Sequence, residues 1–176
     1  MMRKLKNSEL GRLSVDEFKA NDKTPIVVVM DNIRSSNNVG SLFRTSDALI
    51  VNSLYLCGIT NTPPSDDIRK TALGAEESVD WKYFENTLDA IAVLKAYGYK
   101  ICAIEQVEHS IMLPDFQPTK GEKLALVFGN EVKGVDQKVI DQCDACVEIP
   151  QYGTKHSLNI SVSAGVVLWD IFQKIS

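Results

Sequence analysis

The chain lacks any apolar run approaching the roughly 18 residues of a membrane-spanning helix. Residues 1–12 are basic but have no apolar centre like that of a secretion signal, so we expect a cytoplasmic protein. Histidine is scarce, with only His109 and His156, and no cluster of His, Asp and Glu suggests a metal site. Since 44% of the 176 residues are hydrophobic, the chain is long and apolar enough for one globular domain.

Two common nucleotide-binding signatures are also missing. No Gly-x-Gly-x-x-Gly run follows the first predicted strand, which argues against a dinucleotide-binding fold. Gly129 and Gly134 have the spacing of a phosphate loop, but Val135 and Asp136 stand where Lys and Ser or Thr are needed. The CDAC run at 143–146 has no second cysteine pair to complete a zinc site and precedes a late strand, so we interpret it as structural.

The charge balance gives a mixed indication about nucleic acid. A net charge of −4 and a pI of about 5.2 argue mildly against nucleic-acid binding, although phosphate contacts need only local Lys and Arg. Four basic residues gather near the N-terminus, with Glu9 the one acidic residue among them: Arg3, Lys4, Lys6 and Arg12. We expect residues 1–24 to be a short basic extension, which is either a solubilising tail or an RNA-binding arm.

Apolar runs alternate with helical patterns along the rest of the chain. Buried or half-buried strands are predicted at 26–30, 54–57, 79–83, 99–104, 124–128 and 146–149. Helices are predicted at 39–50, 65–70, 87–97, 136–141 and 159–172, and we expect Asn38, Ser65, and either Ser157 or Asn159, to cap three of them. This order predicts a single α/β domain over residues 25–176, with a mostly parallel sheet covered by helices on both faces.

Three polar motifs follow strands directly or after one short loop. They are NVGSLFR at 38–44, FGNEVKG at 128–134, and IP at 149–150 followed by SLNIS at 157–161. In parallel sheets ligands bind at the carboxyl ends of strands. Each motif alone has a structural explanation: a capping Asn with a surface Arg, a tight turn before a helix, and a capped helix start.

Taken together, in this order and at these intervals, the motifs resemble the signatures of the SpoU/TrmH branch of the SPOUT RNA methyltransferases. The resemblance spans about residues 25–174. It implies a C-terminal trefoil knot, in which the final helix threads the loop after Phe128, and an active site completed across a homodimer. The implied reaction is transfer of a methyl group from S-adenosylmethionine (SAM) to a ribose 2′-hydroxyl of tRNA or rRNA, without a metal. The alternative is a non-catalytic RNA-binding or ribosome-assembly module that keeps the fold.

The resemblance also implies roles for particular residues. Arg44 is the catalytic residue, and it binds RNA phosphate; because a guanidinium stays protonated, we favour an electrostatic role and leave the proton acceptor open. The other catalytic residues implied are Asn38, Glu131, Ser157 and Asn159. The cofactor-binding residues implied are Ile104, Gly129, Asn130, Ile149, Ser157 and Leu158.

Some other residues remain open between two explanations. Lys155 and His156 either meet RNA phosphate or are solvated loop residues. Trp169 and Phe172 in the last helix are either anchors of a dimer interface or ordinary core residues.

Overall fold

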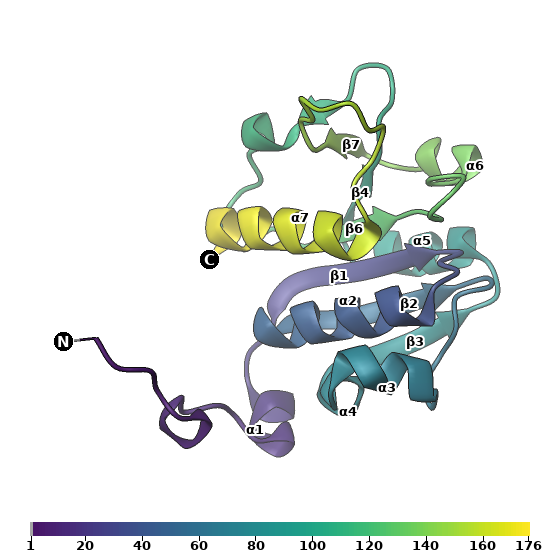
Figure 1. Cartoon of the computed structure of the whole chain (residues 1–176). Helices are drawn as coiled ribbons and strands as arrows, with labels where there is room; N and C mark the ends of the chain where they lie inside the picture. The colour runs from purple at the N-terminus through teal and green to yellow at the C-terminus, as the bar shows by residue number, and fades with distance from the viewer. Residues whose placement is uncertain (1) are drawn as a thin grey trace.

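The computed structural model describes residues 2–176, and Met1 lies outside this range (Figure 1). These residues form one sheet in the order β3-β2-β1-β6-β4-β7-β5, in which every neighbouring pair is parallel. The strands are β1 Thr24–Asp31, β2 Val51–Cys57, β3 Asp80–Phe84, β4 Lys100–Ile104, β5 Ile111–Met112, β6 Leu124–Phe128 and β7 Ala145–Glu148. The prediction of a parallel α/β sheet is therefore confirmed.

Helices cover both faces of the sheet. They are α1 Val15–Ala20, α2 Ser36–Ala48, α3 Asp66–Ala72, α4 Ala75–Ser78, α5 Thr87–Ala96, α6 Gln137–Ile140 and α7 Ile160–Ile175, with short 3-10 turns at Asn7–Glu9 and Leu113–Asp115. Within residues 2–176, no helix is both long and apolar enough to cross a bilayer.

The central strands β1 and β6 are buried on both faces, which explains why their sequences are continuous apolar runs. Side chains alternate between the two faces of a strand. Ile26, Val28 and Met30 pack in one core with α2 and α7, whereas Val27 and Val29 pack in a second core with α5 and α6. In Figure 1, α2 and α7 lie on the near face of the sheet and α5 on the far face.

Several helix starts agree with the sequence, and one does not. Ser65 caps α3 and Asn159 caps α7, as predicted. The prediction that Asn38 caps the next helix is wrong, because α2 begins earlier, at Ser36, and is capped by Ser35. Asn38 instead lies in the first turn, where its backbone N–H donates to Ser35 Oγ at 3.3 Å and its side chain is free for another contact. The helix α1, the short helix α4 and the two-residue strand β5 are absent from the predicted elements.

The segment before β1 is partly folded onto the domain. Ser14 caps α1 in a reciprocal arrangement with Glu17, and Phe18 of α1 is buried in the same core as α2 and α7. Within the basic cluster, Arg3 makes two hydrogen bonds to the Glu9 carboxylate, at 2.9 and 3.0 Å. The part of the N-terminal segment nearest β1 thus contributes to the core.

The strand order brings distant motifs together. β6 lies between β1 and β4, and β7 lies beside β4, so the loops after these four strands emerge from one edge of the sheet. The loop after β1 leads into α2, which contains the first motif. The loop after β6 holds residues 129–134 of the second motif, and the loop after β7 begins with Ile149 and Pro150 of the third.

Candidate active site

A carboxylate from the second motif joins the start of α2. Glu131 accepts hydrogen bonds from the backbone N–H groups of Arg34 and Ser35, at 2.9 and 3.0 Å, and from Asn38 Nδ2 at 2.9 Å. Arg34 and Ser35 directly precede α2, so the carboxylate lies near the positive end of the helix dipole, which suits a negative charge. Asn159 Nδ2 donates in turn to Asn38 Oδ1 at 3.4 Å. The three motifs are therefore linked by one chain of side-chain hydrogen bonds.

These contacts lower the pKa of Glu131. Desolvation acts to raise the pKa of its carboxyl, but the donors from Arg34, Asn38 and Ser35 together outweigh it, so the pKa lies below its ordinary value of 4.5. Protonation therefore opposes folding. The contribution of Glu131 to stability is present above about pH 4.5 and is lost as the pH falls through the lowered pKa.

We predict that Glu131→Gln lowers the melting temperature at pH 7, because the amide cannot accept all three hydrogen bonds with a full negative charge. The difference from wild type should shrink as the pH falls below 4.5. Thermal unfolding followed from pH 7 to pH 3 measures this. Glu85→Gln is the control, because Glu85 is exposed. A difference that stays constant with pH, or that Glu85→Gln reproduces, would contradict the assignment.

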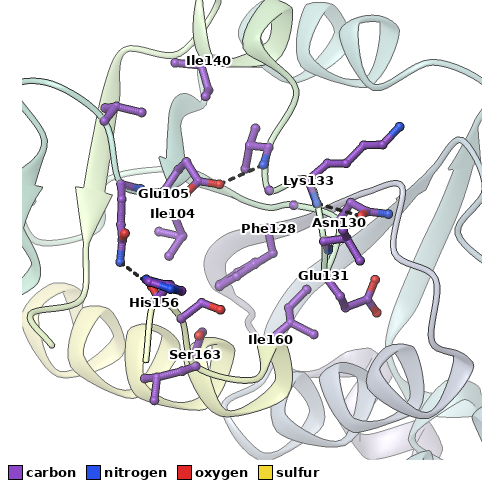
Figure 2. A pocket seen from close by; sticks show the side chains of 18 of the residues that line it. Ile104, Glu105, Phe128, Asn130, Glu131, Lys133, Ile140, His156, Ile160 and Ser163 are labelled. Carbon is purple, nitrogen blue, oxygen red and sulfur yellow. Dashed lines mark hydrogen bonds between the residues drawn. The ribbon is translucent and has the colours of Figure 1, made fainter. Parts of the chain in front are cut away.

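Beside this network lies a cavity of about 710 Å³, called here the main cavity (Figure 2). Its walls come from the end of β4, the loop after β6 and the segment that leads into α7. A smaller hollow of about 120 Å³, the side cavity, shares Ile104, Ser157 and Leu158 with it and also reaches Ile149. The residues expected to bind a cofactor are thus brought together: Ile104, Gly129, Asn130, Ser157 and Leu158 line the main cavity, and Ile149 lines the side cavity.

The second motif is shaped mainly by contacts with its own chain. A Cβ on Gly129 would lie 2.1 Å from Val135 N, so this glycine allows the loop to close on itself. The Asn130 side chain donates to Asn32 O at 2.8 Å and accepts from the N–H groups of Val132 and Lys133. Asn130 therefore faces the cavity as part of a rigid turn whose side-chain carbonyl is already engaged.

The predicted catalytic residues fall into two groups. Glu131, Ser157 and Asn159 line the main cavity, and Asn38 is tied to them by hydrogen bonds. Arg44 does not join them: it is exposed on α2, outside the lining of either cavity, and forms no hydrogen bond or ion pair within residues 2–176. The helix explains the separation, since Asn38 and Arg44 are six residues apart and point to different sides.

The structure adds residues that the motifs did not indicate. Glu105 and Gln106 line both cavities, and Gln106 Nε2 donates to His156 O at 3.0 Å, which ties the end of β4 to the segment before α7. Lys133 and His156 line the main cavity as well. One signal was available: Glu105 and Gln106 come directly after a predicted strand, at the edge where parallel sheets bind ligands.

The cysteines lie away from this chemistry. All four are free, and within residues 2–176 no group of three His, Cys, Asp or Glu side chains is placed to hold a metal ion. Burial raises the pKa of Cys57, Cys102 and Cys143 to about 12 in each case, so these thiols stay protonated near neutral pH.

Fold and site together define a parallel α/β protein with a cavity at the carboxyl ends of its central strands. The model of the SpoU rRNA Methylase family matches residues 25–169. The chain therefore belongs to the SpoU rRNA methylase family. Membership of this family implies the trefoil knot expected above. The two segments that the knot would bring together, the loop after β6 and the segment before α7, both line the main cavity.

Individual relatives agree with this assignment. The chain is 32% identical over 148 residues to the 23S rRNA (guanosine-2′-O-)-methyltransferase RlmB of Neisseria meningitidis, covering 82% of this chain and 56% of the relative. It is 30% identical over 160 residues to a Staphylococcus saprophyticus protein assigned to the TrmH family of tRNA/rRNA methyltransferases, covering 91% and 63%. The AdoMet-bound rRNA methyltransferase of Sinorhizobium meliloti has a similar structure, with a TM-score of 0.79, 25% identity and coverage of 89% and 59%. The chain thus spans 56–63% of the length of these relatives.

Proposed function

We propose that the protein binds SAM in the main cavity and transfers its methyl group to a ribose 2′-hydroxyl of tRNA or rRNA. The observation that carries the proposal is the convergence of the second and third motifs on one cavity, with the first motif tied to them by the Asn38–Glu131–Asn159 hydrogen bonds. The relatives named as RNA 2′-O- and rRNA methyltransferases support the same chemistry.

The cavity suits SAM in size and lining. A volume of about 710 Å³ lies within the range of roughly 300–1,000 Å³ typical of small-molecule sites. Ile104, Phe128 and Leu158 offer apolar surface for the adenine ring, whereas carboxylate, amide and backbone groups line the rest. We assign the cofactor contacts to Ile104, Gly129, Asn130, Ile149, Ser157 and Leu158.

When bound, SAM supplies an electrophilic methyl group, and the chain must align the 2′-hydroxyl oxygen with it. Arg44 binds the RNA phosphate and, because it stays protonated, stabilises the negative charge that develops on the ribose oxygen. Asn38 and Glu131 hold Asn159 in place by hydrogen bonds. Ser157 and Asn159 contact the reacting ribose from the segment that enters α7.

We further propose a homodimer, because Arg44 lies outside the cavities of its own chain. An apolar stripe on α7 offers the interface: Val162, Val166 and Trp169 are exposed, with Trp169 58% exposed, and their spacing places them on one side of the helix. Phe172, half-buried, stacks beside Trp169 with ring centroids 6.3 Å apart. Exposed aromatic and aliphatic side chains of this kind are typical anchors of interfaces. The Arg44 of one subunit would then serve the cavity of the other.

We predict one SAM molecule bound per subunit and SAM-dependent methylation of RNA. Isothermal calorimetry measures the first. Incubation with radiolabelled SAM and either total tRNA or rRNA, followed by mapping of 2′-O-methyl positions, measures the second and separates the two substrate classes. Binding of RNA without binding of SAM, and with no label transferred to either RNA, would favour the non-catalytic module and sink the enzyme proposal.

A further inference from the structure

Glu105 is a carboxylate of the main cavity that belongs to none of the three motifs. It follows directly after β4 and is half-buried (Figure 2). Both carboxylate oxygens are fixed: Oε1 accepts from the Gln106 N–H at 2.8 Å, and Oε2 accepts from the Val135 N–H at 2.9 Å. The side chain is thus fixed by two backbone N–H groups, one from the loop after β4 and one from the loop after β6.

The loop after β6 passes close to this carboxylate. Gly134 has a φ of +70°, and a Cβ at this position would lie 2.3 Å from Glu105 Oε2. Only glycine combines that backbone conformation with so close an approach. The last glycine of the second motif therefore leaves room for the end of the Glu105 side chain, which lines the main cavity.

Within the part of the chain that the structure describes, Glu105 has no partner cation. Within residues 2–176, none of the ion pairs shorter than 4.0 Å includes it. Its two backbone donors leave other lone pairs open, since a carboxylate can accept about four hydrogen bonds. The other cavity carboxylate, Glu131, directs its oxygens to the start of α2.

The negative charge of Glu105 affects the nearby Cys146 thiol. Burial is the first cause that raises the pKa of the Cys146 thiol, and the charge of Glu105 is the second. Lys133 and His156 also line the main cavity, but neither forms an ion pair with Glu105 at 4.0 Å or less. A half-buried carboxylate without a countercharge favours a ligand that carries a positive charge.

We propose that Glu105 supplies the countercharge for the sulfonium of SAM, so that the cavity favours the charged cofactor over its neutral-sulfur product. The inference rests on the proposed function. Transfer of the methyl group leaves the bonding electron pair on sulfur, and the product S-adenosylhomocysteine (SAH) lacks the sulfonium charge. The attraction to Glu105 is lost at that point, which promotes exchange of SAH for SAM.

Calorimetry with SAM and SAH on the Glu105→Gln protein tests this. Glutamine keeps the size of the side chain and removes the charge. We expect SAM affinity to fall by about tenfold, the scale of a charge pair at the border of protein and water, while SAH affinity stays close to that of wild type. The control is Glu108→Gln, which removes an exposed carboxylate three residues away, outside both cavities, and should change neither affinity.

A second variant keeps the Glu105 charge and adds a positive charge beside it. Gln106→Lys places a cation next to Glu105 and keeps a donor for His156 O, so it too should weaken SAM more than SAH. Gln106→Lys replaces Glu105→Gln as the test if the Glu105→Gln protein does not fold. Equal weakening of both ligands, or no change in either, would overturn the inference and leave Glu105 as a brace for the loop. A wild-type protein that binds neither ligand would instead contradict the proposed function itself.

Discussion

Arg44→Ala should slow methyl transfer to RNA by about 10²–10³-fold, the usual loss when one positioned electrostatic contact is removed from a reaction. SAM affinity and melting temperature should stay near their wild-type values. The reason is the position of Arg44: it is exposed on α2, and neither cavity includes it in its lining. Single-turnover methylation with radiolabelled SAM gives the rate, and calorimetry and thermal unfolding give the two controls.

Arg44→Lys should also slow methyl transfer to RNA, because one ammonium group cannot replace the planar, bidentate contact of a guanidinium with phosphate. Arg69→Ala is the matched control, since Arg69 is exposed but its guanidinium lies beside Glu76 and Glu77. Near wild-type methylation by Arg44→Ala would mean that Arg44 is an ordinary surface residue, even though the family assignment would stand.

Trp169→Glu should dissociate the homodimer and abolish methyl transfer with it. Placing a carboxylate in an apolar interface leaves a buried charge unpaired, so we expect the dimer dissociation constant to rise by about 10²-fold or more. Trp169 is 58% exposed in the single chain, so the subunit itself should still fold. Sedimentation equilibrium at micromolar concentration measures the association, and circular dichroism checks the fold.

Tyr97→Glu is the matched control for this change. Tyr97 is also an exposed aromatic, 63% exposed, but it ends α5, on the opposite face of the sheet from α7. Tyr97→Glu should leave both the mass of the dimer in sedimentation and the rate of methyl transfer unchanged. If wild type is already a monomer at these concentrations, or if monomeric Trp169→Glu keeps full activity, the site is not shared between subunits.

Mixing two inactive proteins tests the shared site directly. Arg44→Ala subunits keep an intact cavity, whereas Leu158→Arg subunits keep Arg44 and lose the cavity wall. A mixed dimer contains one complete site if Arg44 acts across the interface, so activity should return on mixing. No recovery, in a mixture shown to exchange subunits, would place Arg44 and the cavity in the same chain.

Local patterns in the sequence were sufficient for most of the fold. The apolar runs at 26–30 and 124–128 became β1 and β6, because strands buried on both faces need unbroken apolar sequence. Three spaced motifs were sufficient for the family. The main cavity lies at the carboxyl ends of the central strands, which is where the rule for parallel sheets predicts a ligand site. The two-residue strand β5 and the short helices α1 and α4 were missed, because a helix of one or two turns or a strand of two residues shows little period of its own.

The tertiary structure alone decided how the site residues act on one another. Asn38 looked like a helix cap, but Ser35 takes that place and Asn38 bonds to Glu131, which is 93 residues away. Glu105 lay in no motif, yet the pairing of β4 beside β6 brings it against Gly134 and the cavity. Hydrophobic period and capping depend on neighbours within a few residues, so the sequence itself determined the elements and the family. Strand order depends on contacts across the whole chain, so only the folded structure determined that Glu131 bonds to the start of α2 and that Glu105 bonds to the loop after β6.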